Sequence, residues 1–143
     1  MGKKMNPVVH FEMGYNDRER MKKFYETVFG WETEQMGPEM GHYVVAHTTE
    51  TANGMVKTPG AINGGFYQKT ANPLSHPPSV VIAVDDIRVA MREVETAGGK
   101  ILGAMDQSGA QTNEPQDIPG VGLWISISDS EGNRVSMLQP SRM

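Results

Sequence analysis

The feature that most constrains the fold of this chain is a pattern of one strand, one helix and three further strands that occurs twice. The first copy spans residues 7–68 and the second spans residues 79–140. Residues 69–78, which include three prolines, separate the copies and are typical of a linker, because proline fixes φ and removes a backbone donor. The pattern therefore predicts an α+β chain in which two βαβββ modules form one domain over residues 1–143.

Each module contains one amphipathic helix. In the first module, Asn16 or Asp17 can cap the helix and Gly30 ends it. Apolar residues recur at i, i+3, i+4, i+7 and i+8, which predicts a single core-facing stripe made of Met21, Phe24, Tyr25, Val28 and Phe29. The helix of the second module repeats this spacing with Ile87, Ala90, Met91 and Val94.

Runs of β-branched and aromatic residues predict the strands. In the first module these runs lie at 7–13, 42–47 and 61–68, with a shorter one after Trp31. In the second module they lie at 79–84, 100–104, 122–128 and 134–139. Residues 105–120 are polar and contain proline and glycine, so we expect an extended loop there.

The composition excludes several classes of protein. The chain has no cysteine, which rules out disulfide scaffolds, thiolate metal sites and cysteine nucleophiles and favours a cytoplasmic location. Its net charge is -4, and no basic block is longer than two residues, so nucleic acid is a poor partner. No apolar run approaches the ~20 residues of a membrane-spanning helix, so we expect no membrane partner.

Two polar residues, His10 and Glu12, share one face of the first predicted strand, because side chains two positions apart point the same way. On one interpretation, His10 is a buried histidine with a hydrogen bond to a neighbour. On the other, His10 is a pocket acid or base and Glu12 is the carboxylate that orients it, since histidine titrates near neutrality. The second interpretation makes His10 and Glu12 the candidate catalytic residues.

Two segments carry a resemblance to a known family. They are Phe-Tyr-Glu-Thr-Val-Phe-Gly-Trp at 24–31 and Asp-Ser-Glu-Gly-Asn-Arg at 129–134. With the repeated element order, they resemble the vicinal oxygen chelate superfamily, which contains glyoxalases, bleomycin resistance proteins and extradiol dioxygenases. The resemblance extends from Pro7 to Pro140. It implies a curved sheet around a cavity shared by the two modules, and association as a homodimer.

The resemblance also implies a metal site that takes one ligand from the first and last strand of each module: a His or Gln, a Glu, a His and a Glu. Here only His10 matches. The alignment of the two modules puts the other three positions at Gly65, Ile82 and Ser136. These residues offer no imidazole or carboxylate, so we expect no metal at the family position and no other cofactor.

Aromatic residues in the predicted strands are candidates for the wall of a ligand-binding cup. Tyr43, Phe66 and Trp124 offer flat rings, and Ser136 is the fourth residue expected to contact the ligand. Because Glu12 adds a carboxylate, the expected ligand is an uncharged or cationic small molecule with a ring, rather than a phosphorylated one.

The sequence leaves three functions open. The leading one is a glyoxalase/bleomycin-resistance-like protein with a degenerate metal site, which binds a small organic ligand in the cup, with or without a reaction. The first alternative is a metal-dependent lyase, isomerase or dioxygenase with a displaced ligand set that includes His10 and Glu12. The second alternative is a non-catalytic interaction protein. The fold cannot choose among them, because function depends on the site.

Overall fold

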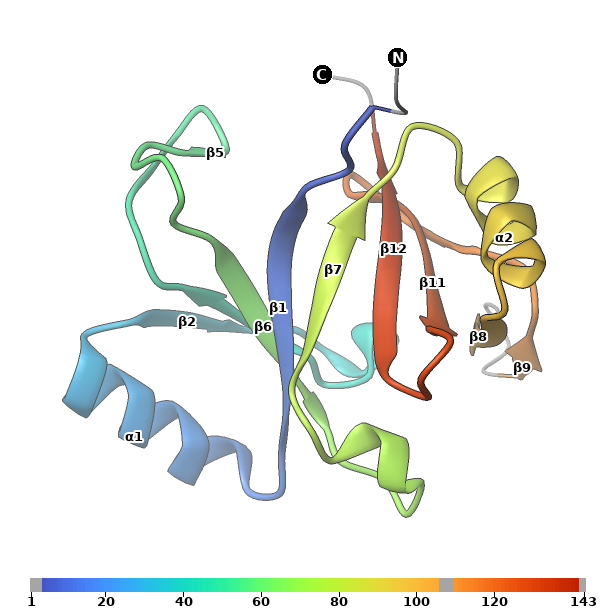
Figure 1. Cartoon of the computed structure of the whole chain (residues 1–143). Helices are drawn as coiled ribbons and strands as arrows, with labels where there is room; N and C mark the ends of the chain where they lie inside the picture. Colours follow the sequence, from blue (N-terminus) through green and yellow to red (C-terminus); the bar gives the residue numbers. More distant parts are fainter. Residues whose placement is uncertain (1–3, 106–109, 142–143) are drawn as a thin grey trace. The chain divides into compact units, whose positions relative to one another are not determined.

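The computed structural model describes residues 4–105 and 110–141 (Figure 1). The chain forms two compact units. The N-terminal unit spans Val9–Ser79. The C-terminal unit combines the segment that ends at Val8 with the chain from Val80 onward. No helix in the described part of the chain is both long enough and apolar enough to cross a membrane.

The N-terminal unit holds a four-stranded sheet in the order β2-β3-β6-β1. Its first strand, β1, runs parallel to its last strand, β6, while β3 pairs antiparallel with both β2 and β6. A two-stranded hairpin, β4-β5, is separate from this sheet. The elements are β1 (Val8–Tyr15), α1 (Arg18–Phe29), β2 (Glu32–Gln35), a 3-10 turn (Pro38–Met40), β3 (Val44–His47), β4 (Thr51–Ala52), β5 (Met55–Val56), β6 (Asn63–Gln68) and a second 3-10 turn (Pro73–Ser75).

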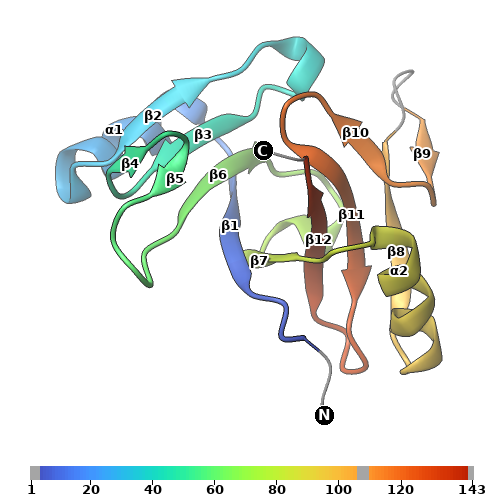
Figure 2. The same cartoon turned by 90° about the horizontal axis from the view of Figure 1, so that it is seen from above.

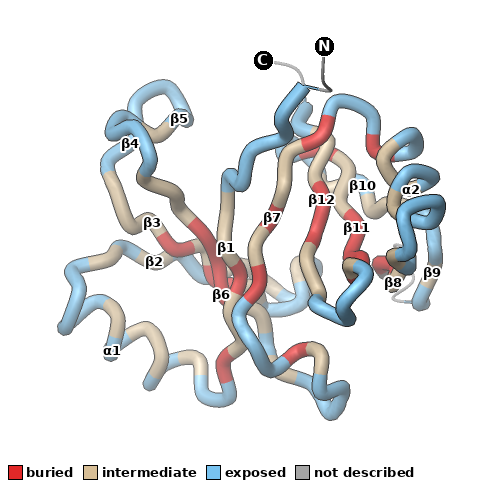
Figure 3. The backbone as a smooth tube through the Cα atoms, viewed as in Figure 1, coloured by how far each residue is buried: buried red, intermediate tan, exposed pale blue. Residues whose placement is uncertain are grey.

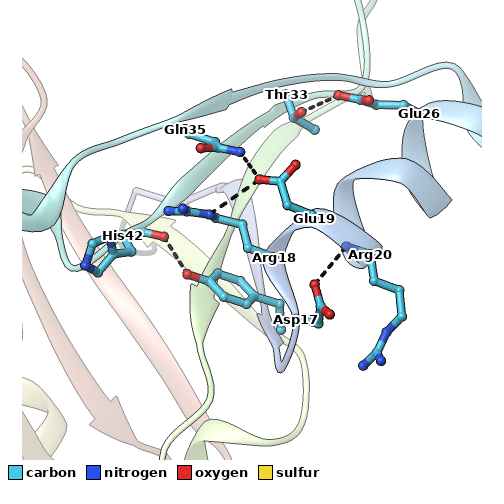
Figure 4. A network of polar contacts seen from close by, with 9 residues as sticks. Asp17, Arg18, Glu19, Arg20, Glu26, Thr33, Gln35 and His42 are labelled. Atoms are coloured by element: carbon cyan, nitrogen blue, oxygen red, sulfur yellow. Dashed lines mark hydrogen bonds and ion pairs between the residues drawn. The ribbon is translucent and has the colours of Figure 1, made fainter.

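Helix α1 begins and ends where its capping residues predict. The Asp17 side chain accepts a hydrogen bond from the backbone N–H of Arg20 at 3.0 Å, which satisfies one of the free donors at the start of the helix (Figure 4). Gly30 ends the helix with φ 71°, a left-handed conformation that glycine adopts without steric cost. The sequence therefore determines both boundaries locally.

Two carboxylates of α1 join the helix to β2. Glu26 accepts a hydrogen bond from Thr33 Oγ1 at 2.5 Å, and Glu19 accepts one from Gln35 Nε2 at 2.5 Å (Figure 4). All four side chains are exposed or partly exposed, so these contacts add little to the stability of the fold.

The predicted core stripe of α1 is only partly buried. Met21 and Tyr25 pack against the N-terminal core, whose buried members are Tyr15, Val44, Ala46 and Phe66. Phe24, Val28 and Phe29 are instead 52%, 55% and 58% exposed, and α1 has no fully buried residue (Figure 3). The expectation was wrong for these three residues, because this small core contacts only the side of the helix that carries Met21 and Tyr25.

The C-terminal unit repeats the arrangement, with its sheet in the order β7-β12-β11-β8-β9, and with β11 lying between β12 and β8 (Figure 2). Its first strand, β7, is again parallel to its last, β12. The α+β class and the two βαβββ patterns are thus confirmed. The elements are β7 (Ser79–Ala83), α2 (Ile87–Thr96), β8 (Lys100–Met105), β9 (Gln111–Thr112), β10 (Gln116–Ile118), β11 (Gly122–Ser128) and β12 (Arg134–Pro140).

In the C-terminal unit, the structure differs from the prediction for residues 105–120 and agrees with it for α2. The stretch expected to be an extended loop at 105–120 carries the short strands β9 and β10, which pair with β8 and β11. The predicted face of α2 is confirmed, since its four residues belong to the core of this unit: Ile87 is fully buried, and Ala90, Met91 and Val94 pack against the buried cluster.

Candidate functional site

In the N-terminal unit, one face of the sheet carries polar residues and the other carries the core. Glu12 on β1 pairs with Gly65 on β6, which pairs in turn with Val45 on β3, so these three residues form a row across the sheet. The next row, shifted by one residue, includes the buried Phe66 and Val44 and lies on the side of α1. Since side chains alternate along a strand, Glu12 and His10 lie on the face opposite the core.

On this face a chain of hydrogen bonds joins three side chains, called the His10–Tyr43–Glu12 cluster below. The Tyr43 hydroxyl donates to Glu12 Oε2 at 3.2 Å. His10 Nε2 lies 3.3 Å from the same hydroxyl. The structure thus brings together both candidate catalytic residues and one of the four predicted ligand-binding residues, with the phenol between the imidazole and the carboxylate.

The surroundings determine the protonation of the cluster. Burial lowers the pKa of His10 below its ordinary value of 6.5, which favours a neutral imidazole at pH 7. Burial, followed by the negative charge of Glu12 and its hydrogen bond, raises the pKa of the Tyr43 phenol well above 10. Glu12 itself is 8% exposed. The phenol therefore keeps its proton and directs it at the carboxylate.

Two adjacent glycines admit aromatic rings on opposite faces of β6. A Cβ atom at Gly64 would overlap the ring of Phe11 on the core side. A Cβ atom at Gly65 would overlap the hydroxyl and two ring carbons of Tyr43 on the other side. Sequence reasoning attributed these glycines to close approach of the backbone and did not identify Tyr43 as the link between His10 and Glu12. The sequence feature that could have indicated this role of Tyr43 is the pair Gly64 and Gly65, because two adjacent residues without side chains leave space for a ring on each face of the strand.

Phe66, a predicted ligand-binding residue, lies in the core instead. Its side chain is 1% exposed, and its ring centroid lies 5.1 Å from that of Tyr25, 6.3 Å from that of Phe11 and 6.4 Å from that of Trp31. The physical reason is strand alternation, because Phe66 follows Gly65 directly and so points to the side of α1.

The remaining predicted ligand-binding residues, Trp124 and Ser136, lie in the C-terminal unit and share one face of β11 and β12. Ser136 pairs with Ser126, and Trp124 pairs with Leu138. Ser136 is completely buried and Ser126 is 6% exposed. Within the described residues, Ser126 Oγ, Ser136 Oγ and Trp124 Nε1 are buried without a hydrogen-bond partner.

The pairing of β7 with β12 shows that one of the expected metal-ligand positions, Ile82, is wrong. Ile82 pairs with Met137 and packs against the C-terminal core, whereas Ser136 pairs with Val81. Ile82 and Ser136 therefore lie on opposite faces, and Val81 is paired with Ser136 as Glu12 is paired with Gly65 in the N-terminal unit. The residue beside Ser136 is a valine, which has no donor atom for a metal either.

The donor set does not fit the metal site that the resemblance implies. Over residues 4–105 and 110–141, no three His, Asp or Glu side chains are grouped so that they could hold a metal ion. The N-terminal unit offers one imidazole and one carboxylate, His10 and Glu12, with the protonated phenol of Tyr43 bonded to both. A protonated phenol donates its one hydrogen, here to Glu12, and does not add a third ligand.

Comparisons with known proteins agree with this fold. The family model described as Glyoxalase/Bleomycin resistance protein/Dioxygenase superfamily matches residues 8–137. A methylmalonyl-CoA epimerase structure superposes with a TM-score of 0.66 at 13% identity, covering 99% of this chain and 100% of that chain. A variant of Streptomyces coelicolor methylmalonyl-CoA epimerase gives a TM-score of 0.65 at 12% identity, covering 98% of each chain.

A superfamily member from Vibrio splendidus gives a TM-score of 0.58 at 17% identity, covering 94% of this chain and 99% of that chain. Among curated proteins no match is found. At these identities the structural likeness establishes the fold alone, while the family model covers most of the sequence. The chain therefore belongs to the glyoxalase/bleomycin resistance protein/dioxygenase superfamily.

Proposed function

We propose that the chain binds a small organic ligand on the sheet face that carries the His10–Tyr43–Glu12 cluster, without the metal ion that its superfamily implies. The observation that carries this proposal is the position of the Tyr43 phenol. It bonds to the imidazole of His10 and to the carboxylate of Glu12, so these polar groups recognise a ligand through hydrogen bonds rather than through a metal.

The exposure and charge of the cluster support a defined class of ligand. His10 and Tyr43 are each partly exposed, while Glu12 is buried and accepts the hydrogen bond of the phenol. A buried carboxylate favours uncharged or cationic partners and disfavours phosphate, because like charges repel strongly at low dielectric. The ring of Tyr43 adds a flat apolar surface for an aromatic ligand.

A second candidate is an isomerase. It is favoured by the likeness to methylmalonyl-CoA epimerase, and the neutral imidazole of His10 would be its base. The epimerase structures share only 13% or fewer of their residues with this chain, so they support this candidate through the fold alone.

Metal analysis together with ligand screening tests the proposal. We expect protein purified without chelator to hold less than stoichiometric Zn, Ni, Mn or Fe. We expect aromatic amines and neutral rings to raise the melting temperature, since a ligand at 100 times its Kd stabilises the fold by about 2.7 kcal/mol. Stoichiometric metal that is lost in His10→Ala would contradict the proposal, as would thermal shifts produced only by phosphorylated compounds.

We also propose that the chain forms a homodimer in the cytoplasm. The exposed apolar side chains of Phe24, Val28 and Phe29 on α1 support the dimer, because a second copy would remove this surface from water. The absence of cysteine supports a reducing compartment.

A further inference from the structure

We infer that Tyr43, held in position by Gly65, fixes His10 as the tautomer protonated on Nε2, so that the lone pair of Nδ1 selects ligands that present an N–H or O–H group. The choice of ligand rests on the function proposed above, whereas the tautomer does not depend on any ligand.

The first step follows from the carboxylate. Across the 3.2 Å contact the Tyr43 hydroxyl is the donor and Glu12 Oε2, a carboxylate oxygen, is the acceptor. A phenol has one hydrogen. Once Tyr43 has given it to Glu12, its oxygen has only lone pairs left for other neighbours.

The second step concerns the imidazole. Because the Tyr43 oxygen offers only lone pairs, the 3.3 Å contact with His10 Nε2 requires that nitrogen to carry the hydrogen. A neutral imidazole has a single N–H, so Nδ1 is then a bare acceptor. The structure gives Nδ1 of His10 no hydrogen bond to any described residue, and the side chain is partly exposed, so a ligand can reach it.

Gly65 is a positioning residue for this arrangement. The hydroxyl and two ring carbons of Tyr43 occupy the space that a Cβ atom at residue 65 would require. The φ of Gly65 lies outside the left-handed region, so an alanine there would be opposed by the phenol and not by the backbone. Gly65→Ala therefore displaces Tyr43 from Glu12 and His10 while it leaves every polar group of the cluster in the chain.

The bare Nδ1 defines the chemistry of the ligand. A ligand with an O–H or N–H group satisfies the lone pair, whereas an analogue of the same shape without that hydrogen leaves a desolvated acceptor unpaired. Sites built to hydrogen-bond one group discriminate strongly against the analogue that lacks it. The expected ligand is therefore a phenol, an alcohol or an amine with an N–H group. An ether or a tertiary amine of the same shape is expected to bind more weakly.

Long-range ¹⁵N–¹H correlation spectra of the four histidines test the tautomer in the free protein, with His10 assigned through His10→Gln. We expect His10 in the wild type at neutral pH to be protonated on Nε2 and bare on Nδ1. Tyr43→Phe and Gly65→Ala are each expected to mix the two tautomers. Tyr25→Phe is the matched control, because it removes a phenol from the core side of the same unit and should leave the His10 signals in place.

Two results would overturn the tautomer assignment: a wild-type His10 protonated on Nδ1, or a Tyr43→Phe protein whose His10 signals match the wild type. If Gly65→Ala does not fold, Tyr43→Phe alone decides the assignment. If Gly65→Ala folds and keeps the wild-type tautomer, the positioning role of Gly65 is wrong.

Titration with phenol and with anisole tests the ligand class, with the His10 signals as the readout. Phenol has the O–H that anisole lacks, and we expect phenol to bind about tenfold more tightly. The preference should disappear in Tyr43→Phe. Equal binding of the two molecules to the wild type would overturn the selectivity. If neither molecule moves the His10 signals, the proposed ligand site is contradicted, and the tautomer remains decided by the spectra of the free protein.

Discussion

The hydroxyl of Tyr43 donates a hydrogen bond to the carboxylate of Glu12 across 3.2 Å, and both side chains lie on the face of the sheet that α1 does not cover. The two residues are 31 positions apart in the sequence. The contact exists because β1 and β3 both pair with β6 and because Gly65 leaves room for the ring.

Replacing Tyr43 tests the energy of this contact. Tyr43→Phe keeps the ring and removes the donor to a buried carboxylate, so we expect the free energy of unfolding to fall by about 1–3 kcal/mol. Urea denaturation measures the change. Tyr25→Phe removes a hydroxyl on the other side of the sheet and should cost less. A Tyr43→Phe protein as stable as the wild type would mean that Glu12 does not rely on this phenol.

The lowered pKa of His10 predicts a pH dependence of stability. In the unfolded chain His10 takes up a proton near pH 6.5, while in the folded chain it does so only at lower pH. The unfolded state therefore binds more protons within this window, so the stability associated with His10 is fully present above pH 6.5 and is lost as the pH falls through the window. Unfolding free energies measured from about pH 8 to pH 5 should fall more steeply for the wild type than for His10→Asn. Parallel curves would contradict the shift.

The orphaned hydroxyl of Ser136 predicts a stabilising substitution. Ser136 is completely buried and its Oγ has no hydrogen-bond partner among the described residues, so Ser136→Ala removes a polar group that burial penalises. We expect no loss of stability, or a gain of about 1 kcal/mol, in thermal or urea denaturation. Ser128→Ala is the contrasting variant, because Ser128 Oγ donates to the backbone oxygen of Asp129 at 3.3 Å and its loss should destabilise. A Ser136→Ala protein that is clearly less stable would reveal a partner for this hydroxyl.

The position of Phe66 predicts a large loss of stability on truncation. Phe66→Ala removes a ring that is 1% exposed from the centre of the N-terminal core, and such changes cost about 3–5 kcal/mol. Phe24→Ala removes a ring that is 52% exposed and should cost much less. Equal effects of the two substitutions on the melting temperature would contradict the assignment of Phe66 to the core.

The apolar surface of α1 predicts an effect on assembly. We expect sedimentation equilibrium to give about twice the chain mass of 15.7 kDa at micromolar concentration. Replacing Phe29, which is 58% exposed, by a charged residue should shift the equilibrium toward the monomer without unfolding the chain. A wild-type protein that sediments as a monomer would contradict the proposed dimer.

Local rules predict the parts of this fold that depend on neighbouring residues. Asp17 and Gly30 define α1 because capping is decided within a few residues of the helix end. The shared face of His10 and Glu12 follows from strand alternation alone. The contact of each with Tyr43 does not, because it depends on how β3 pairs with β6 and on the space above Gly65.

The predictions that the structure contradicts concern residues whose burial or strand face depends on packing between elements. Phe24 and Val28 fit the spacing of an apolar helical stripe. The small core beside α1 nevertheless contacts Met21 and Tyr25 and leaves Phe24 and Val28 exposed. The repeat pattern aligns Ile82 with His10, but β7 pairs with β12 so that Val81 and not Ile82 lies beside Ser136, and neighbouring residues of a strand point to opposite faces. Phe66 was assigned to the cup for its ring, although its strand points it to the side of α1.

In both units the first strand pairs with the last, and this has a consequence for how the protein is made. The residue opposite Glu12 is Gly65, so roughly 50 residues must leave the ribosome before β1 can meet β6. Such non-local pairing slows folding, because the entropy of closing a long loop is lost before the contacts form. The His10–Tyr43–Glu12 cluster is therefore assembled late, and any nascent chain that stops short of β6 has the residues of the site but not the site.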